Sequence, residues 1–217
     1  MVTVQHIVYQ ELSKNPFLTE VLALGLANVS AVANFIHPTV QQEFKKPVKY
    51  SAVGMAIRRY MDNIPYRSIF KFKFPKDLEI STMSDIYEIA IERTPFSDRT
   101  MFSLRKMLSK RKGNFLSIIE GTYEIAFYTN QKNRLLLRKI LRRYKTTSER
   151  ENLSFVSVNF SQDTKEIPGI YYHITRSLAY KGLSIQSFHT IGSEMTIFVK
   201  SEILVETLKT IIQLLRK

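Results

Sequence analysis

The sequence contains no cysteine, which excludes disulfide bonds, thiolate metal sites and catalysis by a cysteine nucleophile. It also has no run of 18 apolar residues, and no basic segment followed by an apolar stretch at its start. We therefore expect no membrane-spanning helix, no signal peptide and no membrane partner. The lack of cysteine is consistent with a reducing, cytoplasmic location.

Motifs of catalytic chemistry are absent as well. The sequence shows neither a G-x-S-x-G nucleophile turn nor a G-x-x-x-x-G-K-[ST] phosphate loop, and its carboxylates follow no motif. The four histidines, His6, His37, His173 and His189, lack the spacing of metal ligands. We therefore predict a protein that is not an enzyme and that has no metal site and no cofactor.

Acidic residues are scarce relative to basic ones. There are 19 Asp and Glu against 32 Lys and Arg, a net charge of +13. Residues 1–76 and 77–150 each carry a net charge of +6, whereas residues 151–217 carry only +1. Such an excess favours nucleic acid or another acidic partner, although it is also compatible with a solvated, self-repelling surface.

Apolar residues make up 44% of the chain, enough to build packed cores. Two breaks in the pattern divide it. The first, at 63–77, contains an alternating run over 69–74 between Pro65 and Pro75, which is typical of a short strand or wing. The second is the polar stretch 145–151. These breaks predict domains over 1–76, 77–148 and 149–217.

The second and third segments resemble each other. Four blocks recur in the same order, at offsets of 67, 67, 70 and 71 residues. They are 86–91 with 153–158, 116–118 with 183–185, 124–128 with 194–198, and the helical stripe of Leu137, Ile140, Leu141 and Tyr144 with that of Leu208, Ile211, Ile212 and Leu215. We ascribe the step to 70 to three extra residues in the hairpin turn. The first helix fails to keep the offset of 67, which predicts a gap there.

Each segment then predicts strand, helix, strand, strand, helix. The expected elements are 83–93, 98–111, 115–121, 123–129 and 131–144 in the first unit, and 153–160, 168–181, 183–190, 194–200 and 202–216 in the second. Gly182 is expected to end a helix, Gly192-Ser193 to form a hairpin turn, and Ser201 to cap the last helix. Two helices should cover one face of each antiparallel sheet.

The second unit resembles an ACT domain of the aspartate kinase type. The features that carry the resemblance are an apolar strand (155–160), Pro168-Gly169 before a helix (170–181), Gly182, the Leu183-Ser184-Ile185 strand and a hairpin strand from Ser193 to Val199. The first unit departs from this pattern, because Thr94-Pro95-Phe96-Ser97-Asp98 stands where the Pro-Gly loop should be. The resemblance covers roughly residues 80–217 and includes no kinase domain.

The resemblance implies a regulatory module that binds a small ligand, usually an amino acid, near the loop before the first helix. Free N–H groups at a helix start suit a carboxylate, and Asp163 or Glu166 would suit an ammonium group. The implied ligand residues are Ser161, Gln162, Asp163, Glu166, Pro168, Gly169, Ile170, Ile185, Gln186 and Ser187. An empty loop in a module that only dimerises remains the alternative.

Residues 1–63 predict helices: a first one with the apolar stripe Val4, Ile7, Val8 and Leu12, then 17–26, 31–36, 39–44 and 52–61. Ser51 is expected to cap the last, whose apolar stripe is Val53, Ile57, Tyr60 and Met61. The 31–36 and 52–61 helices resemble a helix-turn-helix, and 69–74 would be the wing of a winged-helix variant. The expected contacts to DNA or to a protein partner are Lys45, Lys46, Lys49, Tyr50, Ser51, Arg58, Arg59, Lys71 and Lys73. A packing or partner-binding head explains the same pattern.

One basic stripe lies outside this segment. Arg134, Arg138, Lys139, Arg142 and Arg143 line the side of a helix opposite its apolar stripe. It is interpreted either as a solvated face or as a surface for a polyanion or an acidic partner.

The overall prediction is an α+β fold, with a helical bundle or winged-helix-like domain followed by two ferredoxin-like βαββα ACT units. The expected protein is a homodimeric, non-catalytic regulator that senses an amino acid and passes the signal to a head that binds DNA or a protein. The alternative is an adaptor or regulatory subunit whose ACT pair only dimerises.

Overall fold

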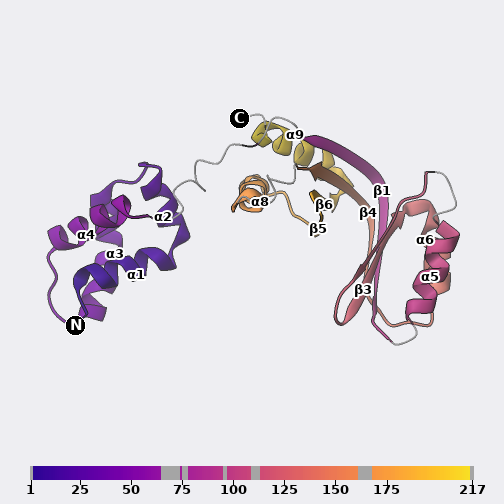
Figure 1. Cartoon of the computed structure of the whole chain (residues 1–217), viewed down its shortest axis with the longest axis horizontal. Coiled ribbons are helices and arrows are strands. Elements are labelled where there is room, and N and C mark those ends of the chain that lie inside the picture. The colour runs from indigo at the N-terminus through magenta and orange to yellow at the C-terminus, as the bar shows by residue number, and fades with distance from the viewer. Residues whose placement is uncertain are drawn as a thin grey trace. The chain divides into compact units, whose positions relative to one another are not determined.

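A computed structural model describes residues 2–64, 74, 78–94, 97–108, 113–160 and 168–215. The chain forms two compact regions, Met1–Lys73 and Phe74–Lys217 (Figure 1). The first, called the head below, is helical within its described part, and the second combines helices with one antiparallel sheet. The predicted α+β fold, with helices first and two βαββα units after them, is confirmed.

Four helices form the head: α1 (Val4–Lys14), α2 (Pro16–Ala23), α3 (Val29–Phe44) and α4 (Tyr50–Asp62). The apolar stripe predicted for the first helix is confirmed, because Ile7, Val8 and Leu12 are buried in the head core. The Asn15 side chain accepts the Leu18 N–H and so starts α2, with Pro16 as its first residue. The helix ends three residues before the predicted position.

The two short helices predicted on either side of Pro38 are wrong, since α3 runs through that proline. Pro38 cannot donate a backbone hydrogen bond, and sequence alone therefore favours a break. Burial of Ile36 and Val40 on either side of it, together with a 2.7 Å hydrogen bond between His37 Nε2 and the Val48 carbonyl, holds the continuous helix.

The α4 helix begins two residues earlier than predicted. Lys49, not Ser51, occupies its N-cap position, and no side chain caps it. The predicted buried residues Val53, Ile57 and Tyr60 do face the core. The predicted wing at 69–74 lies outside the described residues except for Phe74.

The sheet has six strands in the order β2-β3-β1-β4-β6-β5. The strands and helices of the first unit are β1 (Glu79–Glu92), α5 (Ser97–Leu108), β2 (Leu116–Glu120), β3 (Glu124–Asn130) and α6 (Arg134–Leu141). Those of the second unit are β4 (Thr146–Asn159), α8 (Ile170–Tyr180), β5 (Ser187–Ile191), β6 (Glu194–Lys200) and α9 (Leu204–Leu215). The order is the same from either edge of the sheet, because β5, β6 and β4 of the second unit are the equivalents of β2, β3 and β1 of the first.

The long strands β1 and β4 pair with each other over their whole length, from Glu79 opposite Asn159 to Ile91 opposite Thr146. Because the two strands are 67 residues apart, this ladder places equivalent residues around an internal two-fold axis. Asp85 and Asn152, again 67 apart, both adopt positive φ at the centre of the ladder, where its register shifts. The half of β1 before Asp85 extends the sheet of the second unit, and the half of β4 before Asn152 extends that of the first.

This pairing corrects the prediction of a break at 145–151. Those polar residues form the first half of β4, and the cross-strand pair Arg150 with Glu88 supports them. Charged pairs directly opposite each other stabilise a ladder that an alternating apolar pattern would not reveal.

The repeat holds at an offset of 70 for every element after the first strand. Leu104 and Leu108 of α5 correspond to the buried Ile174 and Leu178 of α8, and α9 matches α6 at 70, not at 71. The predicted match of 116–118 to 183–185 is also wrong, since β5 begins at Ser187. The three extra residues therefore belong to the connection between β4 and α8, not to the hairpin.

Two of the three predicted turn and cap residues are confirmed. Gly182 follows α8 with φ 67°, and Gly192 has φ 59° in the hairpin turn between β5 and β6. Both angles lie in the left-handed region that glycine tolerates. Ser201 does not cap the last helix, because its hydroxyl donates to the Asn152 carbonyl and pairs with Ser154 instead.

Helices cover one face of each unit's part of the sheet. In the first unit, α5 and α6 pack on Tyr87, Ile89 and Ile91 of β1 (Figure 1). The opposite faces of the two units turn towards each other and share an aromatic cluster that includes Tyr128, Phe155 and Phe198.

Candidate functional site

The predicted ligand loop is only partly described. Ser161, Gln162, Asp163 and Glu166 lie outside the described residues, while Pro168 and Gly169 directly precede α8. Gly169 has φ 97°, and no side chain caps the helix start. Ile170 is buried in the core. Backbone N–H groups at such a start can donate hydrogen bonds to a carboxylate.

The remaining predicted ligand residues belong to a different place. Ser187 and Phe188 are neighbours on β5, and the Phe188 ring touches Tyr171 of α8 with centroids 5.7 Å apart. Successive strand residues point to opposite faces, so the Ser187 side chain points away from α8 and towards the first unit. The Tyr128 hydroxyl donates to Ser187 Oγ at 2.9 Å, which confirms that direction.

Gln186 forms hydrogen bonds in the same interface. Its carbonyl oxygen accepts from Arg150 Nη1 at 3.0 Å, its N–H donates to the Phe198 carbonyl, and its side chain donates to Ser184. Ile185, beside it, is half-buried. The structure therefore joins Gln186 and Ser187 to the first unit and separates the Ser187 side chain from the start of α8.

Charged and polar groups are buried between the two units. Glu88 accepts from Arg150 Nη1 at 3.1 Å and from Ser148 Oγ at 3.3 Å. Burial raises the pKa of the Glu88 carboxyl above its usual value, and the Arg150 charge opposes that rise only in part. Burial likewise lowers the pKa of His189, whose Nε2 lies 2.7 Å from Ser187 Oγ.

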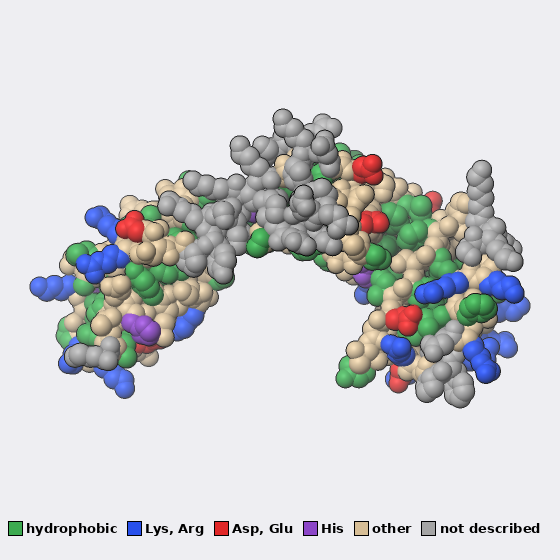
Figure 2. All heavy atoms as spheres, in the orientation of Figure 1, with side chains coloured by type: hydrophobic (Ala, Val, Ile, Leu, Met, Phe, Trp, Pro, Cys, Tyr) green, Lys and Arg blue, Asp and Glu red, His purple; other side chains and the backbone are tan. Residues whose placement is uncertain are grey.

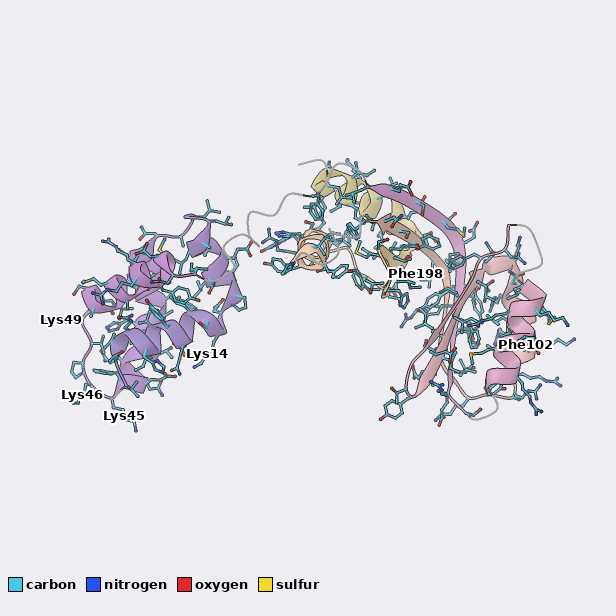
Figure 3. The ribbon with its side chains drawn as sticks, in the orientation of Figure 1. Lys14, Lys45, Lys46, Lys49, Phe102 and Phe198 are labelled. Carbon is cyan, nitrogen blue, oxygen red and sulfur yellow. The ribbon has the colours of Figure 1, made fainter. Side chains whose placement is uncertain are left out.

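A cavity of about 230 Å³ lies in this interface, where the two edge strands β2 and β5 approach each other. Its walls combine aromatic and aliphatic side chains with a few polar groups. They are Phe115, Leu116, Ser117, Phe155, His189, Ile191, Glu194, Thr196 and Phe198. The labelled Phe198 marks the position in Figure 3. Apolar walls with few polar groups are typical of sites for small ligands.

The internal two-fold axis relates the cavity to an equivalent position that different side chains line. Residues 115–117 correspond to 185–187 at the offset of 70, so the predicted Ile185, Gln186 and Ser187 lie at the mirrored position. There the Arg150 side chain binds Glu88 and the Gln186 carbonyl. On the cavity side Phe155 stands in the place of Glu88, and Met83 in the place of Arg150.

Sequence reasoning missed His189, Glu194 and the aromatic walls as site residues. Two signals were available: Glu88 aligns with Phe155 at the offset of 67, and Tyr128 aligns with Phe198 at 70. Such replacements between copies mark where a symmetric interface becomes asymmetric.

The head brings three of its predicted contacts together. Tyr50, Ser51 and Arg58 of α4 line a groove of about 300 Å³ against the first half of α3. The Tyr50 ring stacks on His37 with centroids 3.7 Å apart, which fixes its position at the groove. Arg59 points elsewhere, because its guanidinium donates to Gln5 of α1.

The other predicted head residues lie either in the connection between α3 and α4 or outside the described residues. Lys45 ends α3 with φ 57°, and Lys46 and Lys49 follow it, all three exposed (Figure 3). Lys71 and Lys73 lie outside the described residues.

Within the described residues, no three His, Asp or Glu side chains gather in a way that could hold a metal ion. Over the same residues, no helix is long and apolar enough to pass through a bilayer.

No protein-family model matches the chain, and no curated protein matches it either. Solved structures do. The ligand-free regulatory subunit of aspartate kinase from Thermus thermophilus matches 62% of this chain and 95% of its own, with a TM-score of 0.50 and 15% identity.

Two aspartate kinases match as well. Aspartate kinase from Clostridium acetobutylicum has a TM-score of 0.51 and 16% identity over 63% of this chain, and that of Synechocystis has 0.52 and 16% over 77%. The matches span 34% and 31% of those enzymes. At such identities the likeness is one of fold. The predicted resemblance to the tandem ACT region of aspartate kinases is confirmed at that level, and the matched Thermus thermophilus chain is a regulatory subunit.

Proposed function

We propose that this chain is a non-catalytic regulatory protein whose paired ACT units sense a small ligand, an amino acid, and pass the signal to the helical head. The carrying observation is the pair of βαββα units that share one ladder and enclose a cavity with both apolar and polar walls. The likeness in fold to a regulatory subunit supports the same conclusion. We place the protein in the cytoplasm, as a homodimer.

Two places can receive the ligand. The start of α8 offers backbone N–H groups to a carboxylate, and the candidate residues Asp163 and Glu166 precede it in the sequence. The cavity offers Phe155 and Phe198 to an apolar side chain and the Glu194 carboxylate to an ammonium group. In either place the ligand acts by binding one arrangement of the units more tightly than another, since equal affinity would shift nothing.

The experiment is a thermal-shift screen of the full chain against the twenty amino acids. A ligand at about 100 times its Kd adds about 2.7 kcal/mol of stability, which raises the melting temperature by about 5 °C or more for a region of this size. If no amino acid raises the melting temperature, the sensing proposal fails and the dimerising alternative stands.

Two variants then locate the site. Asp163→Ala abolishes the shift if the ligand binds before α8, whereas Ser117→Phe, which fills the cavity, abolishes it if the ligand binds there. Each variant serves as the control for the other, because the two positions belong to different units. Circular dichroism checks that both variants are folded.

For the head we propose DNA as the partner, through Lys45, Lys46, Lys49 and the groove that Tyr50, Ser51 and Arg58 line. A mobility-shift assay with the full chain tests this. Binding should weaken steeply with salt and with Lys49→Ala or Arg58→Ala. If these variants leave DNA affinity unchanged and a pull-down recovers an enzyme through the head, the adaptor alternative is correct.

A further inference from the structure

The helices of the two units differ sharply in charge. Residues 97–108 and 131–145 contain ten basic residues and one acidic residue, Asp98. The basic residues are Arg99, Arg105, Lys106, Lys132, Arg134, Arg138, Lys139, Arg142, Arg143 and Lys145. The equivalent ranges of the second unit, 167–178 and 201–215, contain two basic and two acidic residues. The shared fold does not require the charge, since one copy lacks it.

Part of this charge is neutralised inside the unit. Arg134 and Arg138 pair with Glu151 and Glu149 of β4, and Lys145 pairs with Glu92 at 3.2 Å. Of the other seven, Arg99, Lys106, Lys139, Arg142 and Arg143 are five exposed cations, and no carboxylate in the described parts of the chain forms an ion pair with them. Lys132, in the turn before α6, is likewise exposed. Unpaired like charges repel one another unless an anion lies between them.

These five cations share one surface. The buried residues Leu104 and Leu108 of α5, and Leu137 and Leu141 of α6, face the sheet. By helical periodicity Arg99, Lys106 and Lys139 therefore face outwards, and Arg142 and Arg143 follow the end of α6 and are exposed. Figure 2 shows Lys and Arg side chains gathered where Figure 1 places α5 and α6. We call this surface the basic face.

One end of the basic face is hollow. A cavity of about 780 Å³ lies between the start of α5 and the end of α6, with Arg99 and Arg143 in its lining beside the ion pair of Lys145 with Glu92. Thr100 and Ser103 add hydroxyls, and Thr100 Oγ lies 2.6 Å from the Tyr144 hydroxyl. Guanidinium and hydroxyl groups are the side chains that hold phosphate oxygens.

The large apolar side chains exposed on these two helices are few. The Thr100–Tyr144 contact shows that α5 and α6 are antiparallel, so Phe102, near the start of α5, lies towards the opposite end from Met107, at the end of α5, and Leu135, at the start of α6. Scattered exposed apolar residues make neither a membrane-binding stripe nor the apolar centre of a protein interface. Dispersed cations without such a patch are the footprint of a phosphate backbone.

We propose that the basic face of the first ACT unit binds the phosphate backbone of a nucleic acid, independently of its sequence. The proposal does not depend on DNA binding by the head, which uses other residues. It gives the two copies separate tasks: the basic copy holds the polyanion, and the neutral copy does not.

The internal repeat supplies a matched test. Lys106 and Lys139 correspond at the offset of 70 to Arg176 and Lys209 of the second unit. The double variants Lys106→Glu/Lys139→Glu and Arg176→Glu/Lys209→Glu lower the net charge equally, on equivalent helices. Fluorescence anisotropy of a labelled 24-base-pair duplex of arbitrary sequence, titrated with the full chain at several salt concentrations, measures binding.

We expect the first double variant to weaken binding about tenfold or more at 0.1 M salt and to reduce the slope of log K against log salt by roughly two. The second should stay within about twofold of the wild type. Equal weakening by both variants would show that binding depends on net charge alone, and this result would overturn the proposal. So would an unchanged affinity in the first variant, which would leave all binding to the head.

A second probe separates other anions from nucleic acid. Vesicles of phosphatidylserine and phosphatidylcholine should not retain the wild type when the duplex does. Retention by vesicles without duplex binding, or the absence of duplex binding at low salt, would overturn the proposal. Unchanged melting temperatures of both double variants confirm that loss of binding is not loss of fold.

Discussion

At the scale of single residues, the interface between the two units contains one buried carboxylate. Glu88 is only 3% exposed and is held by Arg150 and Ser148. A carboxyl group whose pKa rises on folding binds its proton more tightly in the folded state. Its contribution to stability is therefore present below its ordinary pKa of about 4.5 and is lost as the pH rises through the raised value.

This sign gives the first prediction. Glu88→Gln keeps a hydrogen-bonding side chain but cannot ionise. The free energy of unfolding of the wild type, relative to that of the variant, should fall as the pH rises above about 4.5, by at most about 1.4 kcal/mol per pH unit. Urea denaturation between pH 4 and pH 7 measures the difference. A difference that stays constant with pH would show that Glu88 does not titrate as proposed.

At the scale of elements, the centre of the β1–β4 ladder is the point of strain. Asp85 and Asn152 have φ of 57° and 53°, a conformation that Asp and Asn tolerate better than β-branched residues. We predict that Asn152→Val and Asp85→Val each destabilise the region by about 1–2 kcal/mol. Equilibrium urea denaturation is the measurement.

Thr147→Val, at an exposed position of the same strand, is the control and should change little. Replacement of Asn152 by Gly should avoid most of the loss, because glycine adopts positive φ freely. If Thr147→Val and Asn152→Val change the free energy of unfolding equally, the positive φ is not a constraint on the ladder.

The elements also show which features the sequence could predict. Apolar periodicity identified α1, α4 and the helices and hairpins of both units, because burial dictates that pattern. It failed at Pro38, where packing overrides a local breaker, and at 146–151, where cross-strand charge pairs replace apolar ones. The offset of 71 failed because Thr207 and Thr210, not Leu208 and Ile212, are buried in α9.

The candidate site was less predictable than the fold. The resemblance directed attention to the loop before α8, whereas the described cavity arises from the approach of β2 and β5, which no local pattern encodes. Exposed cations are visible in a sequence, but their pairing is not. Arg138 and Lys139 are neighbours, yet only Arg138 has a carboxylate partner at 3.5 Å in the described chain.

At the scale of the whole molecule, the chain divides into two compact regions at Lys73 and Phe74. We predict two thermal transitions in calorimetry of the full chain. Leu12→Ala, in the head core, should lower only one of them, and Ile197→Ala, in the sheet core, only the other, each by about 2–5 kcal/mol of stability. A single transition that both variants shift equally would show that the two regions unfold together.

The shared ladder also limits what can be removed from this protein. Half of β1 and half of β4 extend the sheet of the other unit, so neither unit has its full sheet without the other. A fragment that ends near Tyr144 would expose the unpaired edge of β1, and it would tend to recruit a second fragment in place of the missing strand. Evolution could let the two copies diverge in charge and in ligand, but it could no longer dispense with either.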